Sequence, residues 1–313
     1  MAIQIYGAGM AGLLAAQMLR RHDPVVCELA PKLPDNHGAL LRFRTDAVAR
    51  AVHQDFKRVT VSKGVCIDGV VLDRATIPDT NRYSYKVTGS VMPRSIMNLD
   101  TVERYIAPDN FISELGRYCN IQYGYGATRE RIDAAHADGT AIISTIPMPA
   151  LMSLLLWPER PVFKALPIWS ITATIIDPVT EVYQTLYYPH TEDVRYRASI
   201  TGNKIIVECT KEVREDAVMA MGLLRQTLDE FGIASTPNVV EIKTKHQPYG
   251  KLLPVDERIR REFILWATDH FGVYSLGRFA TWRQLLLDDV VKDVAVVDRF
   301  ISSRDSYTRR VVS

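Results

Sequence analysis

The chain has 313 residues, 47% of them hydrophobic, which is enough to bury the core of one large domain or two. Its 38 basic and 36 acidic residues leave a net charge of +2, too small an excess to indicate a nucleic-acid or membrane surface by itself. The four cysteines form no CxxC pair, so the sequence disfavours a metal site or a dithiol redox site and favours a reducing compartment.

The N-terminus leads directly into an expected strand and shows none of the features of an export signal. The longest apolar runs, such as 151–157, are too short to cross a bilayer. We therefore expect a cytoplasmic protein with no membrane contact. Whether it forms a homodimer stays open.

The first thirty residues predict a dinucleotide-binding unit. An apolar strand at 2–6 is followed by GAGMAG at 7–12, an Ala- and Leu-rich helix at 13–21 and a second strand at 25–29. A G-x-G-x-x-G turn between a strand and a helix is the fingerprint of such units. Glu28 lies near the end of the second strand, where an acidic side chain can accept hydrogen bonds from ribose hydroxyls.

Each residue of this turn has an expected role at a pyrophosphate. Gly7 makes the tight turn, Gly9 lets the backbone approach the phosphates, and Gly12 lets helix and strand pack closely. Met10 and Ala11 lie at the start of the helix, where free N–H groups and a partial positive charge favour an anion. We expect these five residues to bind the ADP half of a cofactor.

Two later segments are predicted to return to the same site. AIISTIP at 141–147 is an apolar strand that ends in a small-residue turn containing Thr145. Near the C-terminus, a strand at 272–276 precedes Gly277 and Arg278, and a helix is expected from 285 to 300 because its apolar residues recur near helical spacing. We expect this closing segment to complete the nucleotide-binding domain.

Four segments together resemble the flavoprotein superfamily that includes flavin amine oxidases, protoporphyrinogen oxidase and UDP-galactopyranose mutase. They are GAGMAG with CELAP, HGALLRFR at 37–44, AIISTIP at 141–147 and GRFATWRQLLLDDVV at 277–291. The last is most similar to the mutase, but this chain has Gln284 and Leu286 where mutases usually have an aromatic and an acidic residue. The resemblance implies FAD as the cofactor, with Leu287 and Asp288 at the start of the last helix beside it.

The resemblance also implies roles for single residues. The loop after the ribose acid lies beside the phosphates in this superfamily, so Gly38 and Arg42 are cofactor-binding candidates, and a guanidinium can neutralise a phosphate. Oxidative members often place a lysine near the flavin ring, and Lys251 is the candidate by position. Arg278, in the matched closing motif, and Arg197 are the other catalytic candidates.

The predicted fold class is α/β: a Rossmann-type FAD-binding domain with a parallel sheet, plus a substrate domain with an antiparallel β-sheet and helices. We assign FAD binding to 1–57, 137–160 and 246–313, a helical insertion on the substrate side to 58–136, and the β-sheet domain to 161–245. That sheet would cover the flavin ring, so the substrate should lie between the sheet and the ring. The substrate-contact candidates are Tyr187, Tyr196, Arg197 and Trp282.

The function that we expect is that of an amine-oxidase-like, FAD-dependent oxidoreductase, which oxidises a C–N or C–C bond of a small molecule. One alternative is a redox-neutral, mutase-like enzyme that acts on a sugar nucleotide. A second is a flavoenzyme that modifies a nucleic-acid base, with a basic surface formed by Arg258, Arg260, Arg261, Arg304, Arg309 and Arg310. A flavoprotein without activity is the non-enzymatic alternative.

Overall fold

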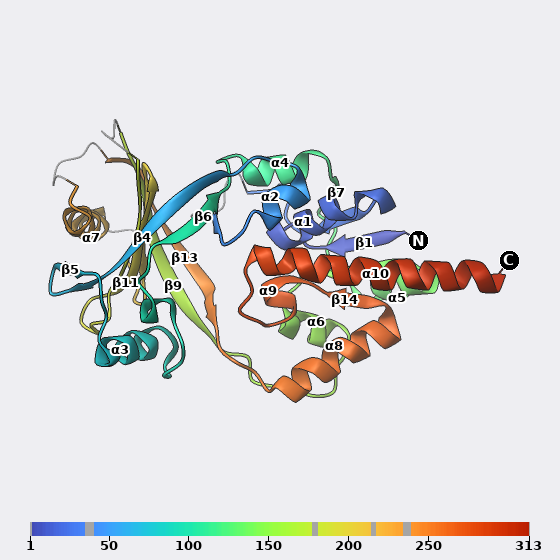
Figure 1. Ribbon diagram of the computed structural model, residues 1–313. Helices are drawn as coiled ribbons and strands as arrows, with labels where there is room; N and C mark the ends of the chain where they lie inside the picture. The colour runs from blue at the N-terminus through green and yellow to red at the C-terminus, as the bar shows by residue number, and fades with distance from the viewer. Residues whose placement is uncertain (1, 35–40, 177–180, 214–216, 234–238, 313) are drawn as a thin grey trace.

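Two β-sheets, lying side by side, organise the molecule (Figure 1). The structure is a computed structural model that describes residues 2–34, 41–176, 181–213, 217–233 and 239–312. In Figure 1 the helix α10 runs along one part and extends beyond it, away from the larger sheet.

The smaller sheet has five parallel strands in the order β14-β8-β1-β2-β7. The strands predicted at 2–6, 141–147 and 272–276 are neighbours in it, which confirms their assignment to one sheet. Strand β8 is buried along its whole length, as expected for a parallel sheet covered on both faces. The bounds are β1 Ile3–Tyr6, β2 Val25–Glu28, β7 Asn120–Tyr123, β8 Ala141–Ser144 and β14 Val273–Ser275.

Helices cover both faces of this sheet and form two separate cores. Residues of α1, α4 and α10 pack in one core with Ile3 and Ile5 of β1, while residues of α5, α6 and α8 pack in the other with Tyr6 and Ile142. This arrangement confirms the predicted Rossmann-type α/β fold. The helices are α1 Met10–Met18, α2 Ala47–Val52, α4 Phe111–Arg117, α5 Arg129–Ala137, α6 Met148–Leu154, α8 Glu257–Phe271, α9 Gly277–Ala280 and α10 Leu287–Val312, with a short 3-10 turn at Arg20–His22.

The larger sheet has nine strands in the order β13-β9-β12-β11-β10-β4-β6-β3, with β5 paired to β4. Its neighbours are antiparallel, as predicted, except β10 and β4, which run parallel. The bounds are β3 Arg42–Phe43, β4 Lys57–Ile67, β5 Val70–Leu72, β6 Val102–Ile106, β9 Ala165–Ile175, β10 Val182–Tyr187, β11 Arg195–Gly202, β12 Lys204–Cys209 and β13 Val239–Leu252.

The two faces of the larger sheet differ in polarity. Ile171, Ile200 and Val207 lie on an apolar face that is covered by α7 (Ala217–Glu230). The alternate residues, among them Thr172 and Thr201, form a polar face turned toward the smaller sheet. At its far end this face is covered by α3 (Ile77–Thr88) and a 3-10 turn at Ser95–Met97, which contribute to a small core.

The chain crosses between the sheets more often than the predicted ranges imply. The range 58–136, assigned to the substrate side, contributes β4, β5 and β6 to the larger sheet but also α4, β7 and α5 to the smaller part. Strand β13 continues to Leu252, beyond the expected boundary at 245, so that Lys251 belongs to the larger sheet. Short strands such as β7 carry little periodicity, and their place depends on tertiary pairing.

A buried ion cluster fastens α7 to the larger sheet. The guanidinium of Arg195, on β11, donates to Glu230 at 2.6 and 3.0 Å and to Asp193 at 2.7 Å. The Arg195 side chain is 1% exposed and that of Glu230 is 5% exposed. Tyr188 also donates to Glu230, at 2.8 Å. A buried charge needs such partners because water does not reach it.

Glu230→Gln is expected to lower the free energy of unfolding by about 2 to 3 kcal/mol, because Arg195 loses a charged partner while it stays buried. Urea denaturation measures this change. Asp229→Asn, at the exposed neighbouring position on the same helix, is the control and should change stability by less than about 0.5 kcal/mol. Equal changes in the free energy of unfolding for the two substitutions would contradict the claim that this buried cluster stabilises the fold.

Candidate functional site

The glycine-rich turn has the backbone geometry that its sequence predicts. Gly7 has φ +101°, and a Cβ there would lie 2.3 Å from Oγ1 of Thr145. A Cβ on Gly12 would lie 2.0 Å from the carbonyl oxygen of Gly7. These two glycines are therefore required by the fold itself. Thr145 belongs to the same turn, since its hydroxyl donates to the carbonyl of Tyr6 at 2.9 Å.

Gly9 differs from the other two glycines because none of the described residues fills the space beside it. A Cβ on Gly9 would meet no atom of those residues within 4 Å, and its φ of −68° and ψ of 172° suit any residue. No side chain caps the N-terminus of α1, and the first turn, which includes Met10 and Ala11, carries no acidic residue. The open space and the uncapped N–H groups lie at one place, which is suited to an anion.

Glu28 lies at the end of β2 beside this turn. Its carboxylate accepts hydrogen bonds from the backbone N–H groups of Ala8 at 2.6 Å and Ala30 at 2.8 Å. These bonds hold the carboxylate in place while each oxygen keeps a free lone pair. The predicted ribose acid is thus positioned next to the turn, as the motif requires.

The closing segment lies against the start of α1. Gly277 has φ +87°, and a Cβ on it would lie 2.8 Å from the Cβ of Ala11. Two polar atoms in this segment are buried with no hydrogen-bond partner in the described structure, Oγ of Ser275 and Nε of Arg278. Unsatisfied buried polar groups are rare, and these two, within four residues of each other, leave hydrogen-bonding capacity in the closing segment.

Leu287 and Asp288 begin α10 but have contacts within the protein. Leu287 packs against the core of the smaller part. The Asp288 carboxylate accepts from the backbone N–H and the hydroxyl of Thr45, each at 2.9 Å, and from the N–H of Arg44 at 3.3 Å. Asp288 therefore fastens the segment that follows β3 to α10, next to the place predicted for the cofactor.

Arg42 lies elsewhere than predicted. Its guanidinium donates to the hydroxyls of Thr201 at 2.6 Å and Thr185 at 2.7 Å, and also to the carbonyl oxygens of Gln184 and Ile200. Burial lowers its pKa to about 10. These contacts use the guanidinium at the larger sheet, and its role at a cofactor phosphate stays a prediction. Gly38, the other candidate in this loop, lies outside the described residues.

A cluster of ionisable side chains lies on the larger sheet near the closing segment. Glu208 of β12 is 8% exposed and accepts from the hydroxyl of Tyr196 at 2.7 Å and from Nε of Arg197. The ammonium of Lys251 lies 5.0 Å from the centre of the Tyr196 ring. Three predicted residues are thus brought together around a carboxylate that the sequence did not single out.

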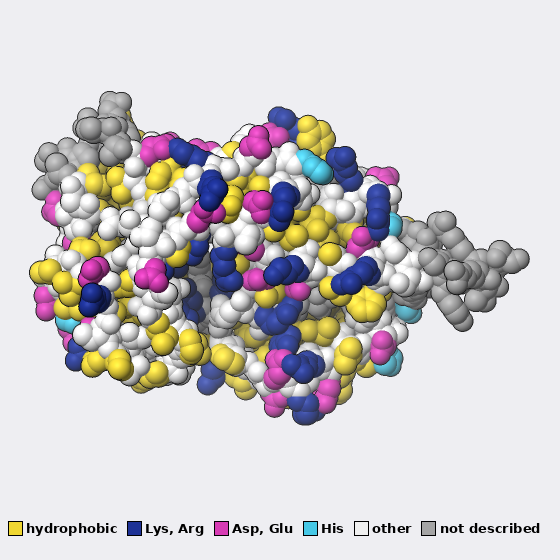
Figure 2. All heavy atoms as spheres, in the orientation of Figure 1, with side chains coloured by type: hydrophobic (Ala, Val, Ile, Leu, Met, Phe, Trp, Pro, Cys, Tyr) yellow, Lys and Arg dark blue, Asp and Glu magenta, His cyan; other side chains and the backbone are white. Residues whose placement is uncertain are grey.

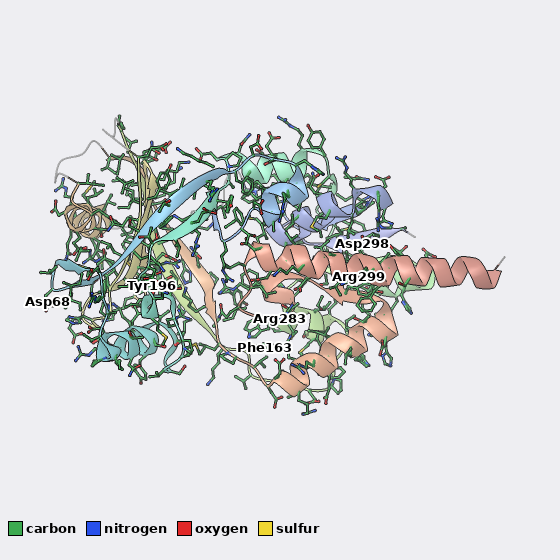
Figure 3. The ribbon with its side chains drawn as sticks, viewed as in Figure 1. Asp68, Phe163, Tyr196, Arg283, Asp298 and Arg299 are labelled. Carbon is green, nitrogen blue, oxygen red and sulfur yellow. The ribbon has the colours of Figure 1, made fainter. Side chains whose placement is uncertain are left out.

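The closing segment reaches this cluster through Arg278. Its Nη2 donates to the carbonyl oxygen of Gly250 at 3.0 Å, one residue before Lys251. Figure 3 labels Tyr196 on the larger sheet and Arg283, which follows α9, on the other part. Figure 2 shows several Lys and Arg side chains where the two parts meet.

Positive charge dominates this cluster. Burial, together with the nearby charges of Arg197, Arg94 and Arg278, lowers the pKa of Lys251 to about 7, while the charge of Glu208 opposes the shift. Burial also lowers the pKa of Arg278. Four cationic side chains around one carboxylate are suited to a substrate that carries negative charge.

Two predicted substrate contacts have packing partners within the protein. Tyr187 is 5% exposed, and its ring lies 5.5 Å from that of Tyr83 in an edge-to-face pair. Trp282 is 4% exposed and donates from Nε1 to the carbonyl of Leu253 at 3.0 Å. Both aromatic side chains are used in packing, and their contact with a substrate stays a prediction. Tyr196 is fully buried too and contacts the site only through its ring face and Glu208.

Sequence reasoning missed Glu208 and Tyr83, whereas Arg94, in a Pro-Arg-Ser turn, was a candidate pocket residue. Glu208 ends the predicted strand KIIVE, and its pairing with Arg197 follows from the antiparallel register of β11 and β12. A charged residue that breaks the polar–apolar alternation at a strand end was the available signal. No local signal marked Tyr83, because α3 reaches the sheet only in the folded chain.

Among the arginines considered as a surface for nucleic-acid binding, those whose side chains the structure describes have carboxylate partners. On α8, Arg258 contacts Glu262, and Arg260 and Arg261 both contact Glu257. The side chains of Arg304, Arg309 and Arg310 lie outside the described residues.

The described part of the chain contains no group of three or more metal-ligating side chains. Within the same residues, none of the helices combines the length and the apolar character that a bilayer crossing requires.

The comparison with known proteins shows the fold. The chain matches no protein-family model and no curated protein. Among solved structures it is similar to reduced UDP-galactopyranose mutase, with a TM-score of 0.63 and 14% identity over 96% of this chain and 94% of that one.

Two other solved structures are similar over most of their length. An oxidoreductase from Methanosarcina mazei matches with a TM-score of 0.54 and 11% identity, over 96% of this chain and 100% of that one. A mutant of PqsL from P. aeruginosa matches with a TM-score of 0.53 and 14% identity, over 99% of this chain and 87% of that one. The chain therefore has the two-sheet fold that these proteins share, and its chemistry has to be argued from its own residues.

Proposed function

We propose that the protein is an FAD-dependent oxidoreductase that oxidises a C–N or C–C bond of a small, negatively charged molecule. The observation that carries the proposal is the open space at Gly9. Close packing within the protein explains why residues 7 and 12 are glycines, but it does not explain the glycine at position 9. A pyrophosphate that approaches the backbone would require a glycine there. The fixed carboxylate of Glu28 and the unsatisfied Ser275 and Arg278 fit the ribose and the flavin half of the same cofactor.

The residues of the larger sheet would then bind and orient the substrate. Bound FAD would supply the electron acceptor, since its ring takes up two electrons. Arg197 and Arg278 would attract the negative group of the substrate, and Glu208 would keep Arg197 in place. Lys251, with a pKa of about 7, can hold or release a proton at Nζ near neutral pH.

A redox-neutral reaction on a sugar nucleotide is the second candidate. It is supported by the similarity to reduced UDP-galactopyranose mutase over 96% of the chain and by the cationic cluster, which suits a diphosphate. Gln284, whose side chain donates to the backbone of Leu252, stands where the mutase pattern has an aromatic residue and counts against this candidate.

Absorbance spectroscopy tests the cofactor first and the reaction second. The purified protein, with FAD added, should retain bound flavin through gel filtration. The loaded protein is then mixed anaerobically with a panel of amines and amino acids, and bleaching of the flavin band identifies an oxidised substrate. Turnover of UDP-galactopyranose by dithionite-reduced protein would instead favour the second candidate. Protein that never retains FAD would refute both.

A further inference from the structure

A cavity separate from the Lys251 cluster opens on the polar face of the larger sheet, on the α4 side. Its volume is about 490 Å³, within the range of small-molecule sites. It is bounded by the polar face of β9, β10 and the β11–β12 turn, and across from them by the end of β6 and the start of α4. Lys251, Glu208 and Arg278 do not line it.

The two walls of this groove differ in chemistry. The sheet wall carries the uncharged polar side chains Thr172, Thr174, Thr201 and Asn203. The other wall is apolar and includes Leu41, Ile106, Phe111 and Ile112. A molecule with hydroxyl groups on one side and C–H groups on the other would satisfy both walls at once.

The hydroxyl groups of the sheet wall have hydrogen-bonding capacity left. Thr172 and Thr174 donate to Lys243 and Glu241 at 3.4 and 3.0 Å, so each oxygen can still accept. Oγ1 of Thr201 accepts from Arg42 and can still donate. The amide of Asn203 has no side-chain hydrogen bond within the described structure. The wall thus offers both donors and acceptors, as a ligand hydroxyl requires.

The charges around the groove nearly cancel, with one more acid than lysine, unlike those at Lys251. Lys57 is paired with Glu181, and Lys204 is paired with Asp109 at 2.5 Å. In all, three lysines face four acids: Lys57, Lys204 and Lys243 against Asp55, Asp109, Glu181 and Glu241. An anion at Lys57 or Lys204 would have to displace a carboxylate, and the excess acid repels an anion elsewhere, so the groove favours an uncharged ligand.

Arg42 lies between the groove and the cationic cluster. Its guanidinium binds Thr201, which lines the groove, and Thr185, and it lies near Arg197, whose charge lowers its pKa. Four sheet oxygens hold it in place. The same sheet face therefore presents a cationic site on one side of Arg42 and a neutral one on the other.

We propose that this groove binds a small uncharged polyol, such as a sugar. The proposal goes beyond the flavin reaction and does not depend on it. Isothermal titration calorimetry with D-glucose, D-galactose and myo-inositol, on the protein with and without FAD, tests it. At least one probe should bind, with the same Kd in both forms, and glucose 1-phosphate should bind more weakly than glucose.

Variants locate the binding to the groove. The double substitution Thr172→Val and Thr174→Val removes two hydroxyls at nearly constant volume and should weaken binding by roughly 10-fold. Asn203→Ala, at the turn, should weaken it too. Thr60→Val, at an exposed strand position that does not line the groove, is the matched control and should leave the Kd unchanged.

Three results would overturn the proposal. They are no binding of any of the three neutral probes, tighter binding of glucose 1-phosphate than of glucose, or a loss of affinity in Thr60→Val equal to that in the groove variants. Melting temperatures of all variants check that they are folded, and two independent groove variants prevent one misfolded protein from deciding the outcome. Loss of FAD binding alone would refute the proposed flavoenzyme and leave this proposal standing.

Discussion

Gly9→Ala is expected to weaken FAD binding on the order of 100-fold while the protein without FAD stays fully folded. The added methyl group would meet no atom of the described part of the chain within 4 Å and needs no change of backbone angles. It would occupy the space through which a pyrophosphate must approach the N–H groups of α1. Fluorescence titration with FAD gives the affinity, and urea denaturation of the FAD-free protein gives the stability.

Gly222→Ala is the control for this substitution. Gly222 lies on an exposed face of α7, where a Cβ meets nothing within 4 Å. Alanine there should raise stability by about 0.5 to 1 kcal/mol and leave FAD affinity unchanged. Unchanged FAD affinity in Gly9→Ala would show that the cofactor does not lie at this turn.

Lys251→Met is expected to stabilise the protein and to impair its chemistry. The pKa of Lys251 falls from 10.5 to about 7 on burial, so the charged ammonium weakens the folded state at and below neutral pH. Methionine removes that charge and should raise the free energy of unfolding by at most about 5 kcal/mol at pH 6. If Lys251 transfers a proton, turnover should fall by roughly 100-fold or more.

The pH dependence of the stability gain in Lys251→Met distinguishes removal of a buried charge from better packing of the methionine side chain. The unfolded chain binds the lysine proton up to pH 10.5 and the folded chain only up to about pH 7, so this penalty disappears as the pH rises between these values. The advantage of Lys251→Met in urea denaturation should therefore be larger at pH 6 than at pH 9. A constant advantage at both pH values would contradict the lowered pKa.

The parts of the site that follow from local sequence could be predicted. The turn at Gly7, Gly9 and Gly12, with Glu28 after it, depends on one strand–turn–helix–strand unit, and the structure has that unit. The closing Gly277 was also predictable, because a strand, a Gly-Arg pair and a helix follow one another there. In each case, neighbours in the sequence are neighbours in space.

The residues that lie at the larger sheet or pack beside it could not be predicted in the same way. Arg42 is close to the nucleotide motif in sequence, yet it binds Thr185 and Thr201, more than 140 residues away. Glu208 meets Lys251 only because β12 and β13 both pair with β9. Trp282 is a large aromatic next to a matched motif, and whether it packs or faces a ligand depends on neighbours such as Phe163, whose ring lies 4.7 Å away. These outcomes depend on strand register and on which side chains pack against one another in the folded protein.

The repeated crossing of the chain between the two sheets has a mechanical consequence. Six connections join the two parts, after β2, before and after α2, after β6, after α6 and after β13. We expect these connections to restrict relative movement of the two parts more than a single linker would. Neither sheet is encoded by a continuous stretch, so no fragment of the gene should yield one half alone. A ligand between the sheets would enter and leave by movement of loops and side chains, and heating should melt both sheets in one transition.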